Sequence, residues 1–350
     1  MIYILFFVLC IFYSCNSQNN SIIFSTKKAK SNRNESEKII KHYESDEQKL
    51  AAAKFLIQHM AFHYNKNNSN EVNLQDLYDK HAAISEKYNW MKTPLPWRQE
   101  IDSLEKAYAH QIAAFSFLDY KSDIETIKSE WLIKQIDLAF EAWQNNIYTR
   151  EYPFEMFCEF ILPYRFKEGI ILEDSKEMFY KRHHTIFKDS VGASFIQRID
   201  SILYYYKDIR YNFFAGDRIP INSVKTFEQI KYGQCGDRSW FNSLVLASSG
   251  IASSIDFAPS QGNRNNSHTW NAIITPSQTI PFEPFWDEDR WKYKIMYNNK
   301  TTDRKWGKLR FAKVYRNTFS INKTGPLFDP NISKEDIVDV FRKLDFKTEE

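Results

Sequence analysis

Gly233-Gln234-Cys235-Gly236-Asp237 begins the most informative segment of the sequence, residues 233–250, GQCGDRSWFNSLVLASSG. Apolar residues dominate its second half, and Gly250 closes it, as glycine often does just beyond the end of a helix. We therefore expect a helix over residues 235–249. Its first turn carries Cys235, and the backbone N–H groups of a first turn have no partner within the helix.

The sequence beyond this helix alternates between apolar and polar residues in short runs, which is the pattern of half-buried strands. The expected strands cover residues 254–258, 268–274, 280–285 and 311–319. One helix followed by several strands is typical of an α+β unit. The predicted fold class is therefore α+β, with a short helix at 332–341 near the end of the chain.

The first half of the chain has helical spacing instead, and residues 36–207 read as all-helical. The two clearest apolar stripes consist of Leu50, Ala53, Leu56, Ile57 and Met60, and of Trp131, Leu132, Ile136, Ala139 and Trp143. Ser45 and Gln48 have the spacing of a capping box in front of the first stripe. Residues 15–35 are rich in Asn, Ser and Lys, and they predict a flexible tether.

Composition excludes several classes of protein. The chain has 350 residues, of which 43% are hydrophobic and 26% charged, so a wholly disordered chain, a collagen and a coiled-coil rod are excluded. A formal net charge of +3, from 47 basic and 44 acidic residues, does not favour nucleic acid as a partner. Aromatic residues make up 16% of the chain, which favours a large buried core over an aromatic surface for sugars.

The first residues have the character of a targeting segment. Met1 to Ser14 is an uncharged apolar run with the length of a signal-peptide core, and it is too short to span a bilayer as a helix. Phe12-Tyr13-Ser14-Cys15 resembles the lipobox of bacterial lipoproteins. The resemblance implies export, a lipid on Cys15 and attachment to a membrane of the cell envelope. The alternative is a cleaved secretory signal and a secreted or periplasmic protein.

Common nucleotide, dinucleotide, zinc-protease and α/β-hydrolase motifs do not occur in the sequence. No Cys-x-x-Cys pair is present either, so neither a zinc ribbon nor a redox dithiol is expected. His59 and His63 form an i, i+4 pair beside an apolar stripe, and we interpret them as packing or surface residues rather than metal ligands. We expect neither a metal nor an organic cofactor.

Cys235, His268 and Glu283 form the combination that indicates chemistry. The start of a helix stabilises a thiolate and can hydrogen-bond the oxyanion formed when sulfur attacks a carbonyl. His268 opens an expected strand and can take the thiol proton and return it to a leaving amine. Glu283 lies on the next expected strand, where it can orient the imidazole. These three residues are the predicted catalytic set.

The order of these motifs resembles the transglutaminase-like branch of the papain superfamily. The matching pieces are Gly233-Gln234-Cys235-Gly236-Asp237, Gly250-Ile251-Ala252-Ser253, His268-Thr269-Trp270 and Glu283-Pro284. The family usually has Asp where this chain has Glu283, so Asp287 and Asp289 are further candidates to orient the histidine. The resemblance implies a papain-type α+β domain and a thioester intermediate.

The wider chain is similar to transglutaminase-domain lipoproteins of Bacteroidetes, in which a helical region precedes the thiol domain. The resembling segments are 49–53, Trp131-Leu132-Ile133, Leu162-Pro163-Tyr164-Arg165 and Lys313-Val314-Tyr315-Arg316. The implied organisation is a signal peptide (1–14), a tether (15–35), a helical region (36–210), a transglutaminase-like domain (211–325) and a tail (326–350).

Roles are also predicted for four further residues. Gln229 precedes Cys235 by six residues, where papain-like enzymes place an oxyanion-hole glutamine, and it is a candidate for that role. Asp237 is expected to hydrogen-bond the helix start, Trp270 to pack, and Cys158 to be inert within an apolar helix.

The sequence leaves the function open between two classes. In the first, the protein cleaves or transfers acyl groups of peptide, protein or cell-wall substrates, with water or an amine as the acceptor. Removal of a glycan from an asparagine amide is a variant of the same chemistry. In the second, the domain is inactive and binds glycan or peptide at the cell surface.

Overall fold

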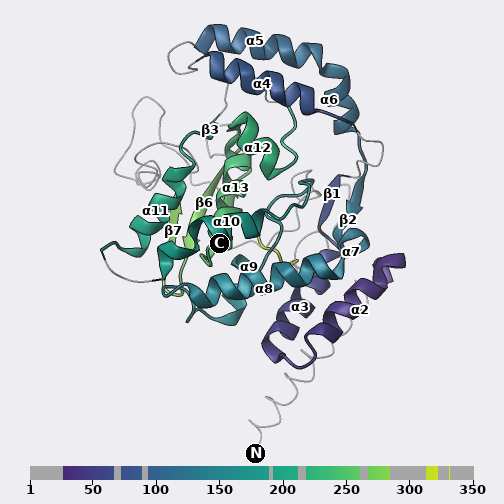
Figure 1. Ribbon diagram of the computed structural model, residues 1–350, viewed down its shortest axis with the longest axis vertical. Coiled ribbons are helices and arrows are strands. Elements are labelled where there is room, and N and C mark those ends of the chain that lie inside the picture. The colour runs from purple at the N-terminus through teal and green to yellow at the C-terminus, as the bar shows by residue number, and fades with distance from the viewer. Residues whose placement is uncertain are drawn as a thin grey trace, which may run out of the picture.

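The computed structural model describes residues 27–66, 72–88, 94–188, 192–211, 218–260, 267–283, 313–321 and 331. Within these ranges the chain mixes helices with one four-stranded sheet, and the predicted α+β class is confirmed at this level. Helices form most of the molecule and surround the sheet (Figure 1).

The helices are η1 (Lys30–Asn32), α2 (Arg33–His42), α3 (Glu47–Met60), α4 (Gln75–Lys87), α5 (Pro94–Ala107), α6 (Ala109–Ser116), α7 (Asp123–Thr126), α8 (Ser129–Asn145), α9 (Phe154–Phe160), α10 (Ser175–His183), η2 (His184–Phe187), α11 (Phe195–Tyr205), α12 (Val224–Ile230) and α13 (Cys235–Ser248). The strands are β1 (Tyr64–Lys66), β2 (Tyr120–Ser122), β3 (Arg210–Tyr211), β4 (Tyr232–Gly233), β5 (Ser253–Ala258), β6 (His268–Ile274), β7 (Thr279–Phe282) and β8 (Tyr315–Arg316).

The sheet has the order β7-β6-β5-β8, and all of its neighbours are antiparallel. Ala258 pairs with His268, and Asn271 pairs with both Ile255 and Phe282, so His268 lies at one end of the strand ladder. The expected strands at 254–258, 268–274 and 280–285 are confirmed in outline by β5, β6 and β7. Of the expected strand at 311–319, residues 313–319 are described, and within them only Tyr315–Arg316 form a strand, β8.

α13 is the central helix, and every residue from Arg238 to Ser248 is buried. It packs on β5 and β6 and also on α8 and α10 of the first half. The chain leaves it through Gly250, whose φ of +73° favours glycine, and a Cβ there would lie 2.3 Å from the Ala142 carbonyl oxygen. The predicted helix with its glycine stop is therefore confirmed.

Two large hydrophobic cores each draw residues from both halves of the chain. In the first, Leu56, Ile136 and Phe157 of the helical region pack with Ala272 and Ile274 of β6. In the second, Phe179 and Ile199 pack with Phe241 of α13 and Ile273 of β6. The helical region and the thiol-bearing region are therefore stabilised by shared apolar burial.

The tether expected over 15–35 is wrong for its last residues, because η1 and α2 already occupy Lys30–His42. Asn32 is 5% exposed, and its amide donates to the carbonyl oxygens of Ile124 (3.1 Å) and Ile127 (2.8 Å). These bonds fix the segment to α7 although its composition is polar. The segment 1–26, with its expected signal peptide and the lipidation candidate Cys15, lies outside the described residues.

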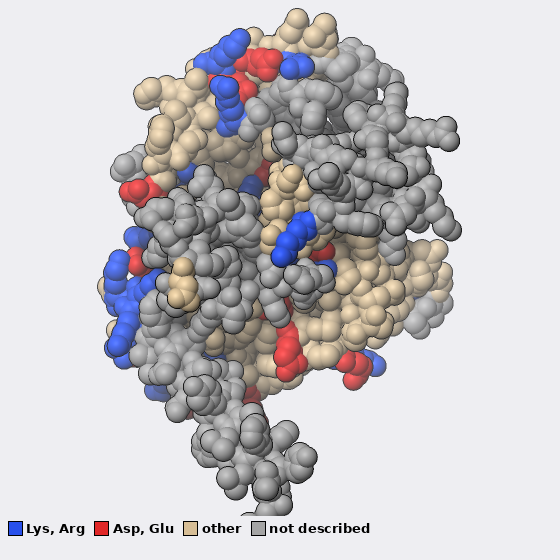
Figure 2. Space-filling view, turned by 180° about the vertical axis from the view of Figure 1, so that it is seen from behind, with Lys and Arg blue, Asp and Glu red and all other residues tan. Residues whose placement is uncertain are grey.

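α4, α5 and α6 form a helical extension at the top of Figure 1, with α12 of the second half packed against α4. The first half also contains the short strands β1 and β2, which pair antiparallel and which the all-helical prediction missed. Lys and Arg side chains form several separate small groups on the described part of the face in Figure 2, as do Asp and Glu. No helix among the described ranges combines the length and apolar character needed to cross a bilayer.

Candidate active site

Cys235 is the first residue of α13, as the sequence predicts, and it is partly exposed. The start of the helix is fixed by Asp237, whose Oδ2 accepts the Gln234 backbone N–H at 3.0 Å, so its expected capping role is confirmed. Gly233 permits the close turn before the cysteine, because a Cβ there would approach Phe227 to 2.7 Å and the Asp237 Cβ to 2.9 Å. The Cys235 thiol therefore lies in the first turn of α13, where the backbone N–H groups have no partner within the helix.

His268, the first residue of β6, hydrogen-bonds the Cys235 thiol through its side chain. Its Nε2 faces Oε1 of Glu283 at 3.2 Å, which leaves Nδ1 for the sulfur. The two side chains are 14% and 13% exposed, so the ion pair is largely shielded from water. The structure therefore brings together the three residues predicted from the sequence.

The electrostatics of the site favour a thiolate beside an imidazolium. Burial alone raises the pKa of Cys235, but His268 and the backbone N–H groups of Thr269 and Gly236 lower this pKa below that of an ordinary thiol. Burial alone lowers the pKa of His268, but Cys235 and Glu283 raise this pKa to about 9. Both shifts favour moving the proton from sulfur to nitrogen, which is the activated state of a cysteine nucleophile.

A buried polar cluster ties the helix of the cysteine to the strand of the histidine. Asn271, three residues after His268, donates to the Ser239 carbonyl oxygen at 2.9 Å and to Ser243 Oγ at 3.0 Å, both on α13. Its own Oδ1 accepts from the Asn242 amide at 3.2 Å. Because Asn271 is fully buried, these bonds specify the register of α13 on β6.

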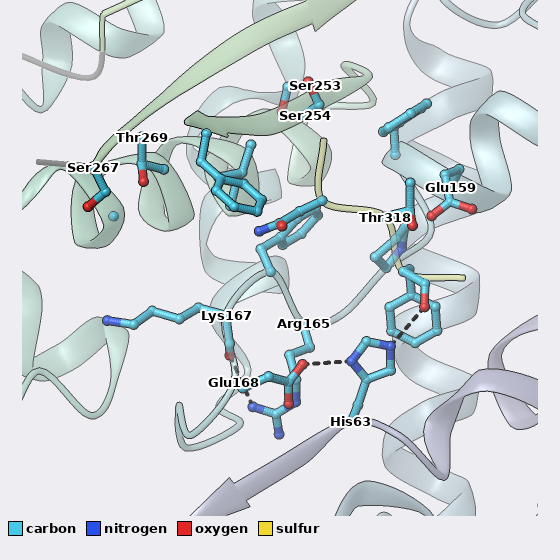
Figure 3. A pocket seen from close by; sticks show the side chains of 18 of the residues that line it. His63, Glu159, Arg165, Lys167, Glu168, Ser253, Ser254, Ser267, Thr269 and Thr318 are labelled. Carbon is cyan, nitrogen blue, oxygen red and sulfur yellow. Dashed lines mark hydrogen bonds and ion pairs between the residues drawn. The ribbon is translucent and has the colours of Figure 1, made fainter. Parts of the chain in front are cut away.

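A cavity of about 800 Å³ opens beside the thiol. Gly236 and Thr269, whose N–H groups bond the sulfur, line this first cavity. Its other walls come from the segment 159–168 of the helical half, from β5 and from the segment 317–319 (Figure 3). The helical half therefore forms one wall of the cleft next to the cysteine, a role that no sequence pattern indicated.

A second cavity of about 530 Å³ is lined partly by the same segment, residues 167–168. It shares Gly236, Lys167 and Glu168 with the first cavity and reaches Gln234 and Asp237 at the start of α13. The Lys167 ammonium pairs with the Asp237 carboxylate at this boundary. Residues at the start of α13 thus line both cavities.

A second histidine–carboxylate pair lies at the first cavity, and sequence analysis missed it. His63 Nδ1 lies 2.7 Å from Glu168 Oε1, and its Nε2 lies 2.9 Å from the Phe319 carbonyl oxygen (Figure 3). Both nitrogens face acceptors, and only a protonated imidazole donates from both. Burial alone lowers the pKa of His63, but Glu168, the Phe319 carbonyl and Asp123 together raise it.

The remaining predicted residues have other environments. Gln229 donates its amide to Asp79 at 2.6 Å and accepts from Gln75, so its side chain binds α4, and the proposed oxyanion-hole role is not supported. Cys158 is 5% exposed in the first core, where burial raises its pKa, as expected of an inert thiol. Trp270 is buried and stacks on the His268 ring, with ring centroids 5.9 Å apart. Asp287 and Asp289 lie outside the described residues.

Within the part of the chain that the structure describes, no group of three or more His, Cys, Asp or Glu side chains is arranged to hold a metal ion. No protein-family model matches the chain, and searches of curated proteins and of solved structures find no significant match. The site is therefore interpreted from its own geometry.

Proposed function

We propose that the protein is a thiol-dependent enzyme of the transglutaminase-like kind, which acts on carboxamide or peptide bonds. The Cys235 thiolate attacks the carbonyl carbon, and the backbone N–H groups at the start of α13 stabilise the oxyanion. His268 then donates its proton to the leaving amine, and a thioester on Cys235 remains. Water or a second amine, deprotonated by His268, attacks the thioester and regenerates the thiol.

One observation carries this proposal: the Cys235 sulfur is hydrogen-bonded to His268, and the far nitrogen of the same ring is 3.2 Å from Glu283. A nucleophile, a base and an orienting carboxylate in that sequence of contacts is the arrangement that activates thiols and hydroxyls on unrelated folds. The two cavities that Gly236 lines give a substrate room next to the residue that follows Cys235.

The proposal is tested by alkylation with iodoacetamide between pH 5 and pH 9, followed by peptide mapping. We expect the rate at Cys235 to stay high well below the pKa of about 8.5 of a free thiol, because the thiolate persists there. Cys158 is the internal control and should react only after unfolding. Slow labelling of both cysteines, with the pH dependence of a free thiol, would rule out the enzyme.

A second experiment, on a Cys235→Ala variant, separates the enzyme from an inactive binding protein. Cys235→Ala removes the nucleophile while leaving the cavities in place, so an enzyme loses all acyl transfer. A binding protein would keep its ligand affinity in this variant and would show no thioester adduct by mass spectrometry. Substrates for this assay are carboxamide peptides with water or a fluorescent amine as acceptor.

We further propose that the protein is an exported lipoprotein anchored through Cys15. This proposal depends on the lipobox resemblance of Phe12–Cys15. Metabolic labelling with an alkyne fatty acid should modify the full-length chain, and Cys15→Ser should abolish the label. An unlabelled wild-type protein in the soluble fraction would favour a secreted form instead.

A further inference from the structure

The first cavity has walls whose charges already have partners. His63 pairs with Glu168 at 2.7 Å, and Lys167 pairs with Asp237. Arg165, only 1% exposed, pairs with Asp123 through two bonds of 2.6 and 2.7 Å. A charged ligand would have to break one of these pairs, and replacing a buried pair partner is costly.

Hydroxyl groups in the same walls are also engaged within the protein. Ser254 Oγ donates to Asp256 Oδ1 at 2.7 Å, and Thr318 Oγ1 donates to the Ser320 carbonyl oxygen at 2.7 Å. The remaining large apolar wall side chains are Ile255 and four phenylalanines, Phe160, Phe166, Phe257 and Phe319. A surface of this kind gains most from apolar and aromatic groups.

The position of the first cavity near Cys235 and His268 indicates which part of a substrate would occupy it. Ser267 and Thr269, which flank His268, lie at one end of the first cavity, and Thr318 and Glu159 lie at the opposite end (Figure 3). Because Gly236, the residue after Cys235, also lines this cavity, a group attached to an amide that reacts at Cys235 can extend into the space. The second cavity has Lys66, Arg218, Glu168 and Asp237 in its lining and is the more polar of the two.

We propose that the first cavity is the specificity pocket of the thiol site, and that it selects amide substrates carrying an aromatic or large apolar group next to the reactive bond. This inference rests on the proposed function of Cys235 and names the substrate class for that site. It assigns to the segment 159–168 and to Phe319 a recognition role in addition to their packing role.

The test compares three reagents on the wild-type protein: iodoacetamide, its neutral N-phenethyl derivative and its anionic N-carboxymethyl derivative. Rate constants are measured at Cys235 by peptide mapping, and each is divided by the rate of the same reagent with glutathione. We expect the corrected rate of the phenethyl reagent to exceed that of iodoacetamide by about tenfold or more, which corresponds to burial of one ring. The rate with the phenethyl reagent should also saturate with reagent concentration. The corrected rate of the anionic reagent should not exceed that of iodoacetamide.

Thr318→Trp, which fills the end of the cavity away from the thiol, should reduce the phenethyl-to-iodoacetamide ratio toward one. Thr279→Trp, an exposed position on β7 outside the cavity, is the matched control and should keep the wild-type ratio. If Cys235 labels rapidly but all three corrected rates are equal, the specificity pocket is refuted and the proposed function stands. If Cys235 labels no faster than Cys158 with any reagent, the proposed function itself fails.

Discussion

The described residues contain two histidine–glutamate pairs, and they differ in what faces the second nitrogen of each ring. His63 pairs with Glu168 at 2.7 Å, and its other nitrogen faces a carbonyl oxygen, which has no proton to exchange. His268 pairs with Glu283 at 3.2 Å, and its other side faces the Cys235 thiol. A carboxylate partner therefore does not by itself identify a catalytic histidine, because the third group decides whether a proton can move.

The largest difference between the two pairs is expected when each imidazole ring is removed in turn. His268→Asn should reduce acyl transfer by about a hundredfold to ten-thousandfold, the range typical of a lost general acid–base residue. It should also move the alkylation profile of Cys235 toward that of a free thiol. His63→Asn should leave that profile near the wild-type position. Equal effects of the two variants on the profile would contradict the distinction between the pairs.

The free energy of unfolding should depend more on the buried His63–Glu168 pair than on an exposed ion pair. Glu168→Gln leaves a buried imidazolium without its counter-charge and should lower the free energy of unfolding by about 3 kcal/mol, the scale for breaking a buried ion pair. Urea denaturation followed by tryptophan fluorescence measures the change. Lys181→Gln, in the exposed pair with Glu177, is the control and should cost less than about 1 kcal/mol. A cost for Glu168→Gln no larger than the control's would show that His63 is not charged.

Glu283→Gln tests the role of the carboxylate in the His268–Glu283 pair. Removing the negative charge should lower the pKa of His268 from about 9, because Glu283 is one of the groups that raise it. The alkaline limb of the pH–rate profile should therefore move to lower pH, with a smaller loss of rate than in His268→Asn. An alkaline limb that stays in place would indicate that Glu283 does not contact the ring in solution.

The smallest expected effect is the pH dependence of stability. The folded pKa of His63 lies above its unfolded value of about 6.5, so its contribution is complete below that pH and is lost as the pH rises through the folded pKa. The difference in unfolding free energy between wild type and His63→Gln should shrink over this window by at most about 1.4 kcal/mol per pH unit. A difference that grows with pH would contradict a folded pKa of His63 above its unfolded value.

Local patterns predicted the site well, because each part of it has a local signature. The glycine stop at Gly250 and the apolar run fixed α13, and the alternation after it fixed β6 at His268–Ile274, as observed. The helix at Glu47–Met60 was also predicted, but Asp46 rather than Ser45 caps it, since the Asp46 carboxylate accepts the Lys49 N–H at 3.0 Å.

Features that depend on distant contacts were not predictable from the sequence. His63 and Glu168 are 105 residues apart, and no pattern around either one indicates the other. Arg165 and Tyr164 lie in a motif noted only for its resemblance, yet both side chains hydrogen-bond the buried carboxylate of Asp123. The polar segment at Lys30–Asn32 looked like a tether because its few anchoring bonds reach carbonyl groups nearly a hundred residues away.

The burial of α13 on two sides has a practical consequence for dissecting this protein. Expressing residues 211–350 alone would uncover the surfaces of Phe241 and Ile273 that now meet Phe179 and Ile199. Such a fragment would expose a wide apolar face and should self-associate, even though every member of the reactive triad is encoded within it.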